Sequence, residues 1–237
     1  MIKTDLKQTF DWLLFDLDNT LLDFDASSKI AFHKSFQLSG IKTDANDYNN
    51  YLNVNKIAWQ AYSENKMDHE EIKSFRFNKL FEKMKISHLD ALEFNALYFD
   101  QLVLNPVFIK DAMNIIQSLK AKVRLAIISN GMKEVQRPRL EFSGLLNYFD
   151  AVFISGELGF AKPQELFFAH VHSSIGMQTP KDSVLVIGDH LDIDVKGAND
   201  YGFRSAWFNP DGLNKMNGII PHFEIKNLNE IVHLLHI

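Results

Sequence analysis

The stretch LLFDLDNTLLDF, Leu13 to Phe24, places two carboxylates two residues apart inside a strongly apolar segment. A short continuous apolar run such as Trp12 to Leu17 is typical of a strand in a parallel sheet that is covered on both faces. Asp16 and Asp18 would then stand at the end of a buried strand. In open α/β sheets, ligands bind at this end of the strands, so we expect the two carboxylates to be functional.

Further short apolar runs follow along the chain, and each predicts another buried strand. They are Val123 to Ser129, Ala151 to Ser155, Ser183 to Ile187, Ser205 to Phe208 and a weaker run at His222 to Ile225. Segments with helical spacing lie between them. One such segment carries an apolar stripe at Ala112, Ile115, Ile116 and Leu119. A second helix is expected to open at Pro163, with its apolar stripe at Leu166, Phe167 and Val171. The alternation of strand and helix predicts an α/β fold with an open, Rossmann-like parallel sheet.

One part of the chain breaks this alternation, because residues 26–104 contain four helical patterns and no convincing strand. The patterns are Ile30 to Leu38, Tyr48 to Tyr62, His69 to Met84 and Leu89 to Leu102. Helices of this length can pack into a small bundle of their own. We therefore expect an α/β core formed by residues 1–22 and 105–237. The inserted helical bundle, a cap, would comprise residues 23–104.

Composition narrows the class of protein. The 237 residues include 25 basic and 30 acidic side chains, a net charge of −5, which disfavours a nucleic-acid polymer as partner because such binding relies on clustered Lys and Arg. The absence of cysteine excludes disulfides, thiolate catalysis and Cys-based zinc sites. There is no apolar run of membrane-spanning length, and Met1 to Phe10 lacks the apolar core of a signal peptide. We expect a soluble cytoplasmic protein without a membrane segment.

Polar side chains follow three of the predicted strands. Asp16 and Asp18 follow the first, Ser129 and Asn130 the second, and Asp189 comes after the run that ends at Ile187. Carboxylates gathered at one edge of a sheet are costly unless a cation neutralises them, and an all-oxygen site suits Mg²⁺.

Lys162 adds a cation to the same set, because it directly precedes a predicted helix. A lysine, the Ser129 hydroxyl and backbone N–H groups are suitable ligands for phosphate oxygens. Carboxylates also act as nucleophiles toward phosphate. The residues together indicate phosphoryl transfer.

Four motifs now carry a resemblance to a known family. DLDNT at Asp16 to Thr20 resembles the Asp-x-Asp-x-Thr signature of the haloacid dehalogenase superfamily. Ser129, Lys162 and Gly188-Asp189 followed by Asp194 resemble its other motifs, in the same order. The resemblance covers essentially the whole chain, including a helical cap after the first strand.

The resemblance implies a role for each residue. Asp16 would be the nucleophile that forms an aspartyl phosphate, and Asp18 would act first as general acid and then as general base. Ser129, Asn130 and Lys162 would bind the phosphoryl group. The implied ligands of Mg²⁺ are Asp16, the main-chain carbonyl of Asp18, and Asp189. Asp194 would orient the site, although Asp192 in the same loop could compete for that role.

Narrower matches point to a substrate. FDLDNTLLDF, EVQRPRLEFSGLLNYFD and GELGFAKP resemble the bacterial pyrimidine 5'-nucleotidase branch of the superfamily. The resemblance implies a Mg²⁺-dependent phosphomonoesterase of nucleotide metabolism that acts on nucleoside 5'-monophosphates. Dehalogenases of the superfamily lack a carboxylate at the position of Asp18, which favours phosphate chemistry here.

Alternatives stay open at this point. One is a phosphatase or mutase that acts on a sugar phosphate or phosphoglycolate, and another is a non-catalytic binding protein on the same fold. In each case the expected partner is a small phosphorylated metabolite. Phe24, Trp59 and Tyr62 could stack on a nucleobase or simply pack in the protein. Both a monomer and a homodimer are compatible with the sequence.

Overall fold

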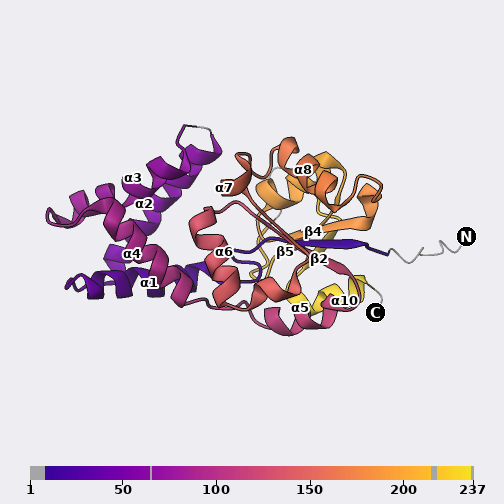
Figure 1. Ribbon diagram of the computed structural model, residues 1–237, viewed down its shortest axis with the longest axis horizontal. Coiled ribbons are helices and arrows are strands. Elements are labelled where there is room, and N and C mark those ends of the chain that lie inside the picture. Colours follow the sequence, from indigo (N-terminus) through magenta and orange to yellow (C-terminus); the bar gives the residue numbers. More distant parts are fainter. Residues whose placement is uncertain (1–8, 65, 215–217, 236–237) are drawn as a thin grey trace, which may run out of the picture. The chain divides into compact units, whose positions relative to one another are not determined.

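A computed structural model describes residues 9–64, 66–214 and 218–235 (Figure 1). It contains a six-stranded sheet with the strand order β3-β2-β1-β4-β5-β6. Every pairing between neighbouring strands is parallel. The strands are β1 (Trp12–Phe15), β2 (Arg124–Ser129), β3 (Ala151–Ile154), β4 (Val184–Gly188), β5 (Arg204–Phe208) and β6 (Phe223–Ile225). The predicted α/β class with an open parallel sheet is confirmed.

The strand order reverses its direction at β1, which lies between β2 and β4. In the register of the sheet, Phe15 stands opposite Ile127 of β2 and Ile187 of β4. The residues that follow these strands therefore come out at one edge of the sheet, on neighbouring strands. A reversal of strand order is the place where open α/β sheets bind ligands, so the topology puts the predicted site residues where a site is expected.

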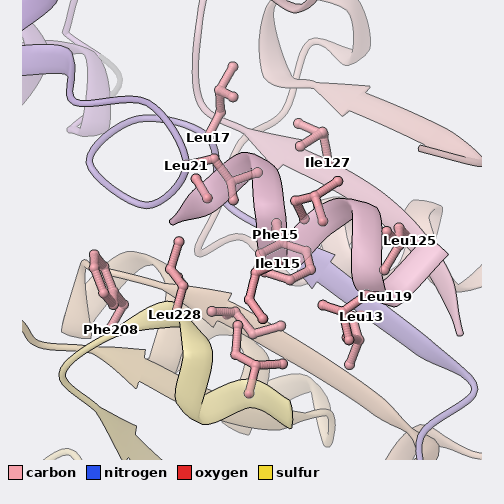
Figure 2. Close-up of a cluster of buried hydrophobic side chains, with 14 of the residues drawn as sticks. Leu13, Phe15, Leu17, Leu21, Ile115, Leu119, Leu125, Ile127, Phe208 and Leu228 are labelled. Atoms are coloured by element: carbon pink, nitrogen blue, oxygen red, sulfur yellow. The ribbon is translucent and has the colours of Figure 1, made fainter. Parts of the chain in front are cut away.

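Helices cover both faces of this sheet. Successive strand residues point to opposite faces, and because these strands are apolar throughout, both faces are buried under helices. Leu13 and Phe15 of β1 pack on one face with Ile115 and Leu119 of α5 (Ala112–Lys120) (Figure 2). Further core residues on this face come from β2 and from the helical turn at Leu228. α5 and α10 (Ile231–Leu234) lie on the same side of the sheet, and α8 (Glu165–Ile175) lies on the other (Figure 1).

α8 packs on the opposite face of the sheet, and one prediction about this helix was wrong. This helix starts at Glu165 rather than Pro163. Phe167 and Val171 are buried against the sheet as expected, but Leu166 is 68% exposed. The buried stripe runs instead through Phe167, Phe168, Val171 and Ile175. Leu166 falls just outside the face that this rotation of the helix presents to the sheet.

The remaining helical segments of the α/β unit lie between its strands, apart from one turn that follows the last strand. They are α6 (Lys133–Phe142), α7 (Ser155–Leu158), α9 (Lys196–Tyr201), a π-helical turn at Leu191–Val195, and short 3-10 turns at Leu145–Tyr148, Lys181–Ser183 and Leu228–Glu230.

The inserted segment consists of four helices that form the cap, as predicted. They are α1 (Phe24–Leu38), α2 (Ala45–Ser63), α3 (His69–Met84) and α4 (Ala91–Leu104). Asp44, Asp68 and Asp90 cap the N-termini of α2, α3 and α4, each accepting a hydrogen bond from backbone N–H groups of the first turn. These caps explain why the helices begin where they do.

Two details of the cap were not visible in the apolar pattern. α1 starts at Phe24, six residues before the predicted Ile30, because its first buried positions are the small polar residues Ser27 and Ser28. Arg76 is buried in the centre of the cap, where its guanidinium donates to the side-chain oxygen of Asn95 at 2.6 Å. Its charge also lies over aromatic rings, 5.2 Å from the centroid of Tyr98.

The chain divides into two compact units, one from Phe24 to Pro106 and one formed by the other described residues. The two chain crossings between the units begin side by side. The backbone N–H of Asp23 donates to the carbonyl of Val107 at 2.8 Å, and Ile109 donates in the same way to Leu21 at 3.0 Å. The insertion therefore starts and ends at one place in the α/β unit. In the described part of the chain, no helix combines the length and apolar character that a membrane crossing requires.

Candidate active site

The predicted nucleophile, Asp16, lies directly after the central strand and is held by two donors. Its side chain is buried, and one carboxylate oxygen, Oδ1, accepts a hydrogen bond from Lys162 Nζ at 2.7 Å. The other, Oδ2, lies 3.3 Å from the hydroxyl of Thr20, which donates to it. The backbone N–H of Asp16 donates to Ile187 of β4. Both the main chain and the side chain of Asp16 are therefore fixed.

Lys162 sits at the centre of this arrangement, although it is 146 residues from Asp16 in the sequence. Its ammonium group donates to Asp16 Oδ1, to Asp194 Oδ1 at 2.6 Å and to the carbonyl of Ile128 at 2.9 Å. Three acceptors thus satisfy its three protons. Burial alone would lower the pKa of Lys162, but the negative charges of Asp16 and Asp194 outweigh it and raise this pKa above its usual value. Lys162 is a permanent cation in the site.

Asn130 holds the backbone of Lys162. Its side-chain amide donates to the carbonyl of Lys162 at 2.7 Å and accepts from the N–H of Lys162 at 2.8 Å. The predicted phosphate-binding role of Asn130 stays a prediction, and its side chain has this second task of fixing the loop that carries the lysine.

Three carboxylates form a group that could hold a metal ion. Ligand atoms of Asp16, Asp189 and Asp194 all lie within 4.8 Å of one another. Burial, together with the charges of neighbouring carboxylates, raises the pKa of Asp16 to about 7 and the pKa of Asp189 to about 8. The lysine does not neutralise this group fully, whereas a divalent cation would favour the ionised carboxylates. The all-oxygen donor set fits Mg²⁺.

Asp194 is placed more centrally than an orienting role alone requires. One of its oxygens accepts from Lys162, and the other accepts from the backbone N–H of His190 at 3.1 Å. These two hydrogen bonds suit the predicted orienting role, while the position inside the carboxylate group also makes Asp194 a candidate ligand. Asp192 is exposed and lies outside that group.

The end of β4 and the loop that follows it leave room for these carboxylates to approach closely. A Cβ atom at Gly188 would lie 2.4 Å from Cγ of Asp194, so only glycine leaves room for that side chain. The indole N–H of Trp207 donates to the carbonyl of Asp189 at 2.8 Å and fixes the backbone of this residue. Neither contact was visible in the sequence.

The side chain of Asp18 points to a different set of partners. Its carboxylate accepts from Arg139 at 2.6 Å and from Gln136 at 2.7 Å. Gln136 also donates to the hydroxyl of Ser129, again at 2.7 Å. The proposed contribution of Asp18 to a metal site, through its main-chain carbonyl, stays a prediction. Gln136 and Arg139 lie in the segment EVQRPRLEF, and no role was predicted for either of them.

A buried histidine and two of the aromatic candidates of the cap lie in packed surroundings. His172 is buried, with its ring nitrogens 3.1 Å from the hydroxyl of Tyr201 and 2.9 Å from the carbonyl of Thr179. In the cap, the ring of Tyr62 stacks on His69 at 4.4 Å, and Trp59 meets Tyr62 edge to face. In the described part of the chain, histidine is absent from the metal-competent group.

Comparisons with known proteins agree with this geometry. The family model for haloacid dehalogenase-like hydrolases matches residues 13–208. The chain is 34% identical to the HAD-hydrolase YfnB of Bacillus subtilis over 225 residues, which is 95% of each chain. The magnesium-bound crystal structure of YfnB superposes with a TM-score of 0.88 at 33% identity and covers 97% of this chain and all of the other.

Two further relatives are named by their activity. The pyrimidine 5'-nucleotidase PynA of Streptococcus pneumoniae is 31% identical over 228 residues, which is 95% of each chain. The pyrimidine 5'-nucleotidase YjjG of Escherichia coli is 27% identical over 226 residues, covering 95% of this chain and 98% of the relative.

Proposed function

The chain belongs to the haloacid dehalogenase-like hydrolase family, and on this premise we propose that it is a Mg²⁺-dependent phosphatase that removes phosphate from nucleoside 5'-monophosphates, pyrimidine nucleotides above all. The observation that carries the proposal is the arrangement of the half-buried Asp189 with the buried residues Asp16, Lys162 and Asp194 at the end of the central strands.

In the first proposed step, a carboxylate oxygen of Asp16 attacks the phosphorus atom of the substrate. A bond forms between Asp16 and phosphorus, and the bond from phosphorus to the ester oxygen breaks. Asp18 gives its proton to the departing oxygen, which leaves as an alcohol. Acid–base help of this kind is worth on the order of 10²–10⁴ in rate.

In the second proposed step, Asp18 takes a proton from a water molecule that attacks the phosphorus of the aspartyl phosphate. The bond between Asp16 and phosphorus breaks, inorganic phosphate leaves, and the Asp16 carboxylate is restored. Throughout, the Ser129 hydroxyl and the backbone N–H of Asn130 bind the phosphoryl oxygens, and the ammonium group of Lys162 stabilises their negative charge from its place beside Asp16.

The residues of the site fit Mg²⁺. Asp16, Asp189 and the carbonyl of Asp18 would hold the ion, with Asp194 beside them, and bound Mg²⁺ would supply positive charge against the negative charge of the phosphoryl group. Support for this comes from the oxygen-rich carboxylate group and from the binding of magnesium by the relative YfnB.

The nucleotide substrate is supported by the two relatives that are named pyrimidine 5'-nucleotidases. Both match 95% of the chain, and their similarity therefore includes the cap as well as the α/β unit.

A substrate panel tests the proposal. Phosphate release would be measured with Mg²⁺ from UMP, CMP, dTMP, AMP, sugar phosphates and phosphoglycolate, for the wild type and for Asp16→Asn. We expect the highest kcat/KM with a pyrimidine nucleotide and no turnover by Asp16→Asn. A clear preference for a sugar phosphate, or interconversion of its isomers without phosphate release, would contradict the nucleotide assignment. Substantial turnover by Asp16→Asn would contradict the covalent mechanism.

A further inference from the structure

We propose that Gln136 and Arg139 are positioning residues of the reaction: they fix the direction of the Asp18 carboxylate and orient the Ser129 hydroxyl as a hydrogen-bond donor. The inference rests on the proposed function, because it concerns the acid–base group and the phosphate-binding hydroxyl of that mechanism.

The first observation is where helix α6 places the two side chains. Gln136 and Arg139 are three residues apart on α6, so they lie on the same side of the helix. They are 2% and 0% exposed, on a helix that also buries Val135 and Leu140. Burying an amide and a guanidinium is costly unless both are well paired. Their partners lie at the end of β1 and β2, in the candidate site.

The second observation is the direction of the hydrogen bonds. Arg139 Nη1 donates to Gln136 Oε1 at 2.7 Å and to Asp18 Oδ1 at 2.6 Å. Because a guanidinium has only donors, the oxygen of the Gln136 amide must face it. The amide nitrogen of Gln136 must then point the other way. It donates to Asp18 Oδ2 and to the hydroxyl oxygen of Ser129, both at 2.7 Å.

This direction has a consequence for Ser129. Its oxygen accepts from Gln136, so the hydroxyl proton remains available for another acceptor. The oxygens of a phosphoryl group are acceptors only, so the network leaves Ser129 in the orientation that binds such a group.

The consequence for Asp18 is a fixed side-chain direction. Each of its carboxylate oxygens has its own donor, one from Arg139 and one from Gln136. The pair therefore keeps Asp18 apart from the group formed by Asp16, Asp189 and Asp194, where another carboxylate would compete for Lys162. Two carboxylates only two residues apart thus keep separate partners.

The third observation is the space that Gly131 leaves. A Cβ atom at this position would lie 2.4 Å from Cγ and 2.5 Å from Nε2 of Gln136. The glycine next to the phosphate-binding residues is therefore needed for Gln136 to reach Ser129 and Asp18.

The test compares two leaving groups. p-Nitrophenolate departs without help from an acid, whereas the alkoxide of a nucleoside monophosphate requires protonation by Asp18. The variants are Gln136→Met, which keeps the length of the side chain but removes its donors, and Arg139→Lys. Arg137→Gln is the matched control, because Arg137 lies on the same helix but is solvent-accessible and paired with Glu157.

For folded Gln136→Met and Arg139→Lys, we expect kcat on the nucleotide to fall roughly 10- to 100-fold with a much smaller change in KM, a part of what acid–base catalysis supplies. With p-nitrophenyl phosphate, we expect a rapid burst of about one equivalent of nitrophenolate per active site, followed by slow turnover. The burst follows because the aspartyl phosphate forms without acid help but its hydrolysis needs Asp18. Arg137→Gln should behave like the wild type in every measurement.

Equal losses on both substrates without a burst, in variants whose circular dichroism matches the wild type, would overturn the inference and leave only a structural role. Unchanged kinetics would also overturn it. If Arg139→Lys does not fold, Gln136→Met alone decides the outcome. An inactive wild type, or an active Asp16→Asn, would overturn the proposed function itself and would be seen before any variant of α6 is compared.

Discussion

The ammonium group of Lys162 lies 2.7 Å from a carboxylate oxygen of Asp16, and both side chains are buried. A buried ion pair of this kind does not simply add stability, because both charges lose their hydration. Its effect is to fix the proposed nucleophile and to lower the pKa of Asp16 relative to what burial alone would give, beside a cation that the neighbouring carboxylates keep charged. The predictions below follow from this balance of charge.

The first prediction concerns the loss of that cation. Lys162→Met would leave Asp16 and Asp194 buried without their lysine, and we expect the free energy of unfolding to fall by about 3–5 kcal/mol at pH 8. The loss should be smaller at pH 5, where the carboxyls can protonate. Urea unfolding at both values measures it. As a control, Lys196→Met removes an exposed i,i+4 pair with Asp200 and should cost at most about 1 kcal/mol.

The second prediction concerns the metal-free protein. The pKa values of Asp16 and Asp189 in the folded state, about 7 and about 8, lie above the ordinary value of 3.8. At a pH between the ordinary value and these raised values, the folded state binds more protons than the unfolded state. The free energy of unfolding therefore falls as the pH rises from about 4 to about 8. Thermal unfolding in EDTA across this range measures the effect. Asp189→Asn should flatten the profile, and a profile that rises with pH in the wild type would contradict the charge balance described above.

A third prediction separates two aspartates of the same loop. Asp189→Asn removes a half-buried carboxylate of the metal-competent group, and we expect it to weaken Mg²⁺ binding at least roughly 10-fold, the loss typical even for a residue that only supports a ligand. Asp192→Asn removes an exposed carboxylate outside the group and should leave the affinity unchanged. Calorimetric titration with Mg²⁺ measures both variants. Equal weakening by the two substitutions would show that general charge, rather than coordination, binds the ion.

The fourth prediction uses the close contact at Gly188. In Gly188→Ala the new Cβ would stand 2.4 Å from Cγ of Asp194, and this carboxylate must move. Asp194 accepts a hydrogen bond from Lys162, so its movement would also displace the lysine. We expect kcat to fall by on the order of 10²-fold, as misplacement of a catalytic group by about 1 Å does. Circular dichroism and steady-state kinetics together check this. A variant that folds and retains full activity would contradict the proposed importance of Asp194.

Much of the fold was predictable because short apolar runs and helical spacing of apolar residues are local patterns in the sequence. The strand positions followed from short apolar runs. Because the carboxyl ends of parallel strands meet at one edge of a sheet, the polar residues after these runs were expected to lie together there. The start of α1 was missed because Ser27 and Ser28, which are buried, do not look like core residues in a sequence.

The site was predictable only in the residues that carry a family motif. Gln136 and Arg139 contact Asp18 across 118 and 121 residues of sequence, and nothing near them in the chain indicates that contact. Their helix also carries the charged residues Lys133, Glu134, Arg137 and Glu141, so polarity alone did not mark Gln136 and Arg139 as buried. The contact of the Asn130 side chain with Lys162 was not predictable for the same reason, because its partner is the backbone of a residue 32 positions away.

The chain leaves the α/β unit after Asp23 and returns to it at Val107, and the pairing of these two residues determines how the inserted segment could be removed or exchanged. The first residue before the insertion and the first after it are already joined by a backbone hydrogen bond of 2.8 Å, so a tight turn could connect them in place of the whole helical segment. No strand of the sheet would have to change its partner. The helical segment is in this sense an exchangeable module, which evolution or an engineer could shorten, replace or graft while the α/β unit keeps its topology.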